Sequence, residues 1–424
     1  MARTHGSTAA AAAASSAEVL AVLLFAGITL ATLRRSSKPW AVHDAYIVSA
    51  IAWFVVQTIC ENAYLALTLT ASGPDLIRLV STWQAPLRDI QIHGFVLLMI
   101  LGVSQRLFHP MYGLPMPSAR LARVSLVLIH LAVIGEASGL VLMRSQSRAW
   151  AGLWYGSVLL LAGTATALVR NWRLFSAAKD TDRSLKFLRI AYVWLFVSLA
   201  MLVALPLYQF VLLRIAAPES HAVQIGFSHA YYGAARHAIT VGFASLMIVG
   251  VAAKVTATLN GIDSRQLSEL WAPFVLINLG CSIRVVGQTL TDFFPAAFPV
   301  AGVSGMLEVA GLTLWGVHLW NIMNGRFAGS SQEPEVRIVA PEERIVASHR
   351  VGDVLDVHPH LLGTLVEFGF RPLQNAALRA TLAKRVTLEA ACRWTGADLE
   401  QLLETLNKRA KPRELSLKRH ACCG

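Results

Sequence analysis

The chain has 424 residues, of which 55% are hydrophobic and only 15% are charged, and its mean hydropathy is +0.53. This composition excludes an ordinary soluble domain and predicts a protein that crosses a membrane several times. The formal net charge of +12 is accounted for by basic loops beside the membrane and a basic tail, so no nucleic-acid partner is expected.

Nine apolar runs are long enough to cross a bilayer as helices. They cover residues 17–33, 44–70, 86–106, 121–143, 150–170, 188–213, 235–255, 269–291 and 299–323. Basic residues follow the first run, whereas a cleaved signal carries them in front, so we expect the first helix to remain. The expected fold class is all-α: a polytopic membrane helix bundle of about nine transmembrane helices with a small cytosolic helical domain.

The second half of the apolar region repeats the first. Gly94–Gly113 matches Gly242–Gly261 without a gap at an offset of 148 residues, through Gly-Phe, Leu-Met-Ile, Gly-Val and a final glycine. This register predicts an internal duplication of four helices, with repeats at about 44–173 and 188–323.

The chain divides into four predicted regions. They are a transmembrane bundle at 1–323, a linker at 324–346, a cytosolic helical domain at 347–409 and a basic tail at 410–424. Lys and Arg concentrate in the loops after the first, third, fifth and seventh helices, which places that side in the cytoplasm. We therefore expect a multi-pass protein of the bacterial inner (cytoplasmic) membrane with a cytoplasmic C-terminus.

Short motifs support helices in the C-terminal domain. Gly369 and Gly396 are placed as helix C-terminal caps, and Asp398 with Gln401 fits a capping box. A helical stripe of leucines follows, formed by Leu399, Leu402, Leu403 and Leu406. The terminal pair Cys422-Cys423 has no zinc-site spacing, so it is expected to be inert.

Ionisable residues inside the membrane are costly and usually functional. Five of them fall at one depth, roughly 10–13 Å below the outer surface by helix rise: Glu61, His93, Glu136, Arg284 and Glu308. They predict either a polar pocket or proton path between the repeats, or a structural ion network. In the ion-network reading Glu136 and Arg284, which occupy equivalent positions in the two repeats, pair across the repeat interface, and we take this pairing as a hypothesis.

Histidines stand just before each copy of the repeated stretch. His93 precedes Gly94 directly, and His237 precedes Gly242 by five residues. Neutral imidazoles on facing helices are suitable haem or metal ligands, so both are candidates for cofactor and metal binding. His130 is a further cofactor candidate.

The segment RHAITVGFASLMIVGVAAK, residues 236–254, resembles the NnrS family of bacterial membrane proteins. That family is described as containing haem and copper and is tied to nitric oxide and denitrification. The resemblance implies a haem ligand at His237 and, in the first half, at His93. The family's Trp-His-Ala-His-Glu-Met cluster is reduced here to Ile92-His93-Gly94, so the resemblance supports haem more than copper.

The C-terminal segments VGDVLDVHPHLLGTLVEFGF and TLEAACRWTGADLEQLLETLN resemble a small helical domain of unknown function. Its relatives form the N-terminal part of di-iron proteins linked to iron–sulfur cluster repair under nitrosative stress. Those relatives carry a Cys-Cys pair where this chain has Phe370-Arg371-Pro372 after Gly369, so the resemblance does not extend to thiol chemistry.

The function expected from sequence is a haem-binding inner-membrane protein in nitric oxide, nitrosative-stress or denitrification metabolism. Its expected partners are the lipid bilayer and a small gaseous or other small-molecule ligand, and a role other than catalysis is favoured. Two alternatives stay open. One is a transporter or channel with a polar site between the repeats, and the other is a quinol-linked membrane cytochrome, which would be an enzyme.

Overall fold

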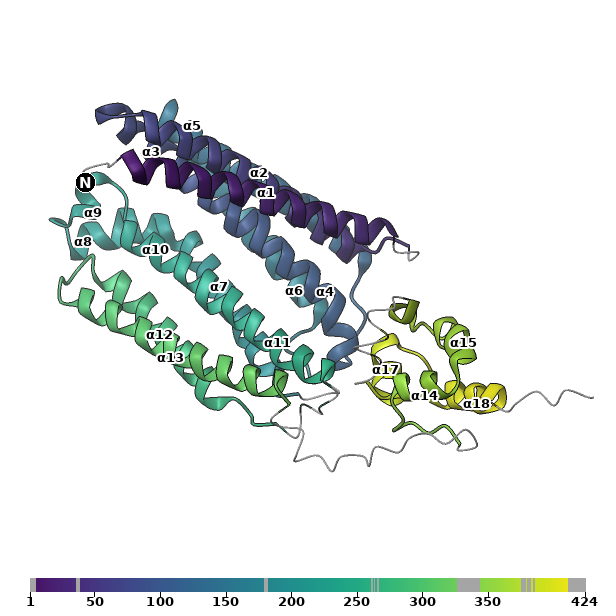
Figure 1. The fold of residues 1–424 in the computed structure, drawn as a ribbon. Helices are drawn as coiled ribbons and strands as arrows, with labels where there is room; N and C mark the ends of the chain where they lie inside the picture. Colours follow the sequence, from purple (N-terminus) through teal and green to yellow (C-terminus); the bar gives the residue numbers. More distant parts are fainter. Residues whose placement is uncertain are drawn as a thin grey trace, which may run out of the picture. The chain divides into compact units, whose positions relative to one another are not determined.

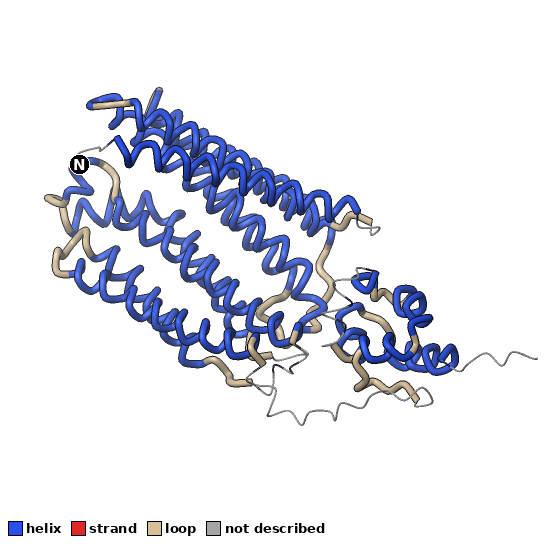
Figure 2. The backbone as a smooth tube through the Cα atoms, in the orientation of Figure 1, coloured by secondary structure: helices blue, strands red, loops and turns tan. Residues whose placement is uncertain are grey.

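The computed structural model describes residues 5–35, 39–178, 182–260, 262, 264, 267–325, 344–374, 379, 383 and 386–410. Within these residues every regular element is a helix (Figures 1 and 2). An isolated antiparallel bridge joins Arg350 and Thr387. The predicted all-α fold class is therefore confirmed. The chain forms two compact units, residues 1–250 with 270–312 and residues 251–269 with 313–424.

Nine helices of the described residues are long and apolar enough to cross a membrane, in agreement with the sequence. They are α1 (His5–Arg35), α2 (Val42–Thr70), α3–η1–α4 (Gly73–Asp89, Ile90–Leu97, Leu98–Tyr112), α5 (Ala119–Ser145), α6 (Ala151–Trp172), α7–η3–α8 (Leu185–Leu207, Tyr208–Leu212, Leu213–Ala216), α10–η4–α11 (His229–His237, Ala238–Ser245, Leu246–Leu259), α12 (Trp271–Leu290) and α13 (Ala297–Met323). The short helix η2 (Arg148–Trp150) directly precedes α6 within the fifth span, and α9 (His221–Ile225) lies in a connection. Figure 1 shows the long helices of the first unit running side by side.

Several spanning helices are longer than their apolar runs, the third and the seventh among them. The third extends over Gly73–Tyr112 and the seventh over His229–Leu259. The added turns at the start of the third helix include charged residues, with an Arg78–Asp75 ion pair at 3.3 Å. A hydropathy window ends at such residues although the backbone stays helical. The spans predicted from hydropathy are therefore shorter at both ends than the helices in the structure.

Both of these long helices contain a π-helical segment at the same relative place. The segments η1 and η4 begin at residues 90 and 238, which differ by the 148-residue offset of the sequence repeat. A Cβ on Gly94 of η1 would lie 3.0 Å from the ring of Trp53, and a Cβ on Gly242 of η4 would lie 2.4 Å from that of Trp194. Each glycine thus lets a tryptophan of the neighbouring helix pack directly on the backbone. Single π-helical turns inside α-helices are frequent at functional sites.

The C-terminal region is a set of short helices around its own apolar core. They are α14 (Val351–Val357), η6 (Pro359–Leu361), α15 (Leu362–Glu367), η7 (Arg371–Gln374), α17 (Leu388–Thr395) and α18 (Leu399–Ala410). The predicted leucine stripe lies on the inner face of α18, where Leu402 and Leu406 are fully buried and Leu399 and Leu403 pack beside them. Burial also raises the pKa of the Cys392 thiol, which keeps it protonated and unreactive.

The predicted caps of this region have the expected geometry. Gly369 and Gly396 adopt φ values of 96° and 74°, a left-handed conformation that glycine tolerates best at a helix end. The side chain of Asp398 accepts a hydrogen bond from the Gln401 amide at 3.0 Å. Residues 326–343 of the expected linker and 411–424 at the chain end, with Cys422 and Cys423, lie outside the described residues.

The orientation of the bundle leads to a first testable prediction. Because Lys and Arg concentrate beside alternate helix ends, the C-terminal region should face the cytoplasm. A reporter enzyme that is active only in the periplasm, fused after residue 410, should give no signal. The same reporter fused after Gln146, in the loop between α5 and α6, should be active. The reverse pattern would show that the orientation is inverted.

Candidate metal centre

The predicted ligand histidines lie in two separate histidine–carboxylate pairs. His93 of η1 contacts Glu136 of α5, with Nδ1 to Oε2 at 2.7 Å. His237, the last residue of α10, contacts Glu308 of α13, with Nε2 to Oε1 at 2.7 Å. The carboxylate comes from the third helix of the first half and from the fourth helix of the second half, so the two pairs are built differently.

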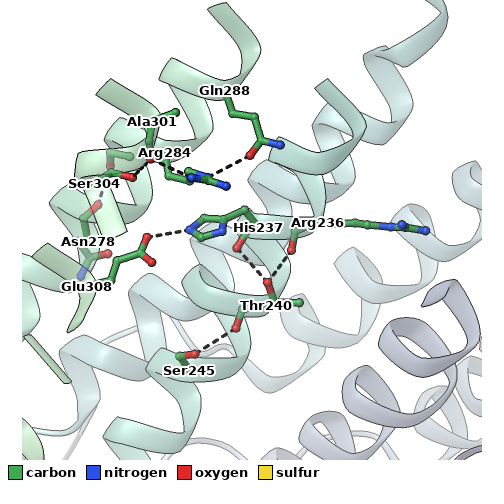
Figure 3. Close-up of polar contacts among 11 residues, drawn as sticks. Arg236, His237, Thr240, Ser245, Asn278, Arg284, Gln288, Ala301, Ser304 and Glu308 are labelled. Atoms are coloured by element: carbon green, nitrogen blue, oxygen red, sulfur yellow. Dashed lines mark hydrogen bonds and ion pairs between the residues drawn. The ribbon is translucent and has the colours of Figure 1, made fainter. Parts of the chain in front are cut away.

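A cysteine completes the second pair. The ligand atoms of His237, Cys281 and Glu308 all lie within 4.8 Å of one another. Cys281 is fully buried on α12, whereas the side chains of His237 and Glu308 are 19% and 12% exposed. In Figure 3 the imidazole of His237 points across to the carboxylate of Glu308. The three residues come from three helices, and we call them the HCE cluster.

Close helix packing places Glu308 in this cluster. A Cβ on Gly280 would lie 2.7 Å from Cγ of Glu308 and 2.9 Å from the backbone oxygen of Ser304. Glycine at position 280 therefore lets α13 approach α12 at the turn that carries Cys281. The sequence predicts no ligand role for Cys281. The signal available there was the Gly-Cys dipeptide one turn before Arg284 on an otherwise apolar helix.

The donor set of the HCE cluster is suited to a borderline or soft metal ion. Imidazole and thiolate together favour zinc or copper, and a carboxylate is a third ligand that either metal accepts. Three protein ligands leave a coordination position for a small exogenous molecule. His237 and Glu308 are now joined by a hydrogen bond, so a metal that uses both groups displaces the proton between them.

The first pair is more deeply buried than the second. The side chains of His93 and Glu136 are 6% and 2% exposed. Oε1 of Glu136 is buried without a hydrogen-bond partner among the described residues. A carboxylate on Nδ1 orients an imidazole so that Nε2 is presented to a metal, an arrangement common in metalloproteins. His93 therefore fits a metal or haem ligand that Glu136 holds in place.

His130, the remaining candidate, is engaged on both ring nitrogens. Nδ1 lies 2.9 Å from the indole nitrogen of Trp53, and Nε2 lies 3.1 Å from the hydroxyl of Ser49. In the second half, the indole nitrogen of Trp194 donates to Oδ1 of Asn278 at 2.9 Å. His130 and Asn278 are thus equivalent packing partners of a tryptophan, which leaves no ring nitrogen of His130 for a metal.

The predicted pairing of Glu136 with Arg284 is wrong. Arg284 donates to the carbonyl of Ala301 at 2.9 Å and to the side chain of Gln288 at 3.2 Å, as Figure 3 shows. Glu136 instead contacts His93. Equal depth in two helices does not bring side chains together, because the direction in which each side chain points also has to agree.

A different ion pair joins the two halves. Arg236 donates to Oδ1 of Asp89 at 2.6 Å, and the hydroxyl of Tyr232 donates to Oδ2 at 2.6 Å. Asp89 is 3% exposed and ends α3, immediately before η1. Arg236 immediately precedes His237 but extends away from it in Figure 3. This ion pair therefore ties together the helices that carry the two candidate ligand histidines.

Glu61 belongs to a third group of polar residues. Its carboxylate contacts Arg88 at 3.2 Å and accepts a hydrogen bond from Gln57 at 2.9 Å. The contact with Arg88 joins α2 to α3. The predicted polar level therefore consists of separate groups in the structure, and of its five residues Glu308 alone belongs to the HCE cluster.

Comparison with known proteins gives two family matches. The family described as "NnrS protein" matches residues 2–326, and the family described as "Domain of unknown function (DUF1858)" matches residues 345–403. No curated protein matches the chain. The first match covers more than half of the chain and includes both histidine–carboxylate pairs.

Proposed function

The chain belongs to the NnrS family, and we propose that it is a metal- and haem-binding inner-membrane protein of the nitric oxide response. The observation that carries this proposal is the HCE cluster, in which His237, Cys281 and Glu308 converge inside the membrane bundle. A transport function alone gives no reason for a buried thiol beside a histidine and a carboxylate. Metal coordination does, because thiolate and imidazole are preferred ligands of zinc and copper.

The two histidines take different roles in this proposal. His237, with Cys281 and Glu308, holds a metal ion and leaves one position open for a small gaseous ligand. His93, oriented by Glu136, is the ligand available to haem iron, which supplies reversible binding of diatomic gases when it is bound. The proposed activity is ligand binding, and no turnover is assigned to it.

We also infer that the bundle arose by duplication of a four-helix unit. The inference is supported by the two π-helical segments 148 residues apart and by the recurring glycine–tryptophan contacts beside them. The Trp53–His130 and Trp194–Asn278 bonds repeat the same arrangement. The histidine–carboxylate pairs break this symmetry, as expected if the two halves bind different groups.

Metal content tests the proposal directly. Elemental mass spectrometry of the purified protein should find about one zinc or copper ion per chain. Replacing Cys281 with Ala should weaken metal binding about 10–100-fold or more, because loss of even an outer-shell partner costs that much. Cys60→Ala is the matched control, because Cys60 is an exposed thiol on α2 outside the cluster. Equal metal content in Cys281→Ala and the unmodified protein would refute the HCE cluster as the site.

The absorption spectrum distinguishes haem binding from the binding of zinc or copper. A Soret band that shifts on addition of nitric oxide is expected, and His93→Ala should change it while leaving the zinc or copper content unaltered. If the protein contains neither metal nor haem after purification under conditions that preserve bound cofactors, the transporter alternative is favoured. Reduction of the haem by a quinol would favour the cytochrome alternative.

A further inference from the structure

A groove lies on the first unit between α6 and α7. Neither of these helices carries His93 or His237. Its volume is about 670 Å³, within the range of about 300–1,000 Å³ typical of small-molecule sites. Its wall is apolar along most of its length, with Leu199, Ala200 and Val203 among the lining residues, and two arginines, Arg170 and Arg173, line it as well. Both arginines belong to the end of α6.

The two arginines are exposed cations without an acidic partner among the described residues. The segment that follows α6 is nevertheless held in place. Arg189 of α7 donates to the carbonyl of Leu174 at 3.0 Å and to that of Ser176 at 2.5 Å. The neighbouring arginine on α7 thus ties down the backbone, while the guanidinium groups of Arg170 and Arg173 stay available to a ligand.

The backbone of Arg173 has a conformation that favours glycine. This residue caps α6 in a left-handed conformation with φ 51°, which costs energy for any residue with a Cβ. At the end of α4 the same conformation is taken by Gly113, with φ 60°. Glycine is therefore the residue that the backbone alone would favour at position 173.

We propose that this groove binds an anionic phospholipid. The phosphate of the headgroup accepts bidentate hydrogen bonds from Arg170 and Arg173. One acyl chain lies along the apolar wall at Ala200 and Val203. Basic pockets between transmembrane helices on the cytoplasmic side suit acidic lipid headgroups, because charge attraction adds to the burial of the chain. The bound lipid bridges α6 and α7, the helices at the junction of the two halves.

Native mass spectrometry of the full-length protein in detergent tests this proposal with two lipids, phosphatidylglycerol and zwitterionic phosphatidylcholine. The unmodified protein should retain phosphatidylglycerol in preference. The double variant R170Q/R173Q should bind it about 30-fold more weakly, the effect of two surface arginines on anionic-lipid affinity. R120Q/R123Q is the matched control, because it removes two exposed arginines at the start of α5 outside the groove. Equal retention by the two double variants would overturn the proposal.

Two single variants make the test independent of folding defects. Arg173→Gly should leave the protein at least as stable without lipid, because glycine relieves the left-handed backbone, yet it should lose most of the stabilisation that phosphatidylglycerol confers. Ala200→Trp should fill the apolar part of the groove and reduce the retention of phosphatidylglycerol, although both arginines remain. If Arg173→Gly is still fully stabilised by phosphatidylglycerol, or if Ala200→Trp changes the oligomeric state instead, the groove is not a lipid site.

Discussion

Replacing Asp89 with Asn should destabilise the bundle by about 3–5 kcal/mol, the usual cost of removing one partner of a buried ion pair. Asp89 is 3% exposed, and its loss leaves the guanidinium of Arg236 without the carboxylate that it contacts at 2.6 Å. Arg236→Gln should have a comparable effect, since it leaves the buried carboxylate uncompensated. Unfolding of the detergent-solubilised protein by a denaturing detergent measures both free energies.

The double variant distinguishes a true pair from two separate defects. D89N/R236Q should cost clearly less than the sum of the single variants, because the second replacement removes the uncompensated charge left by the first. Glu136→Gln with Arg284→Gln is the control cycle, because these residues share no hydrogen-bond partner. Additive effects for Asp89 and Arg236, or strong coupling for Glu136 and Arg284, would contradict the interface described above.

Replacing Gly280 with Val should abolish metal binding at the HCE cluster and lower stability by about 1–3 kcal/mol, the cost of overpacking a close contact. The first added carbon would lie 2.7 Å from Cγ of Glu308 and 2.9 Å from the carbonyl oxygen of Ser304. A backbone oxygen cannot move aside as a flexible side chain can. We therefore expect α13 to be displaced, and Glu308 to be displaced with it.

Gly302→Val on α13 is the matched control. A Cβ at position 302 has no heavy atom within 4 Å, although the change of residue is identical and α13 is the helix that packs against Gly280 of α12. This variant should keep its metal and nearly all of its stability. A Gly280→Val protein with unchanged metal content would mean that the approach of α12 to α13 does not position Glu308 for binding.

The sequence by itself determined the class of the protein and the number of its spanning helices. Apolar composition and run length are sufficient for this, because a bilayer sets both the length and the polarity of a helix that crosses it. The helical C-terminal region was equally readable, since Gly369 and Gly396 mark helix ends and the leucines of α18 repeat at helical spacing. The resemblance of residues 236–254 to the NnrS family was confirmed by the family match.

The partners of the buried polar groups were decided only by the tertiary structure. Depth along a helix can be counted from sequence, but the direction of a side chain depends on helix rotation and on π-helical turns such as η1 and η4. For that reason Glu136 was assigned to Arg284 although it contacts His93. Cys281 was likewise overlooked, because its closeness to His237 and Glu308 arises from three helices that meet where Gly280 permits it.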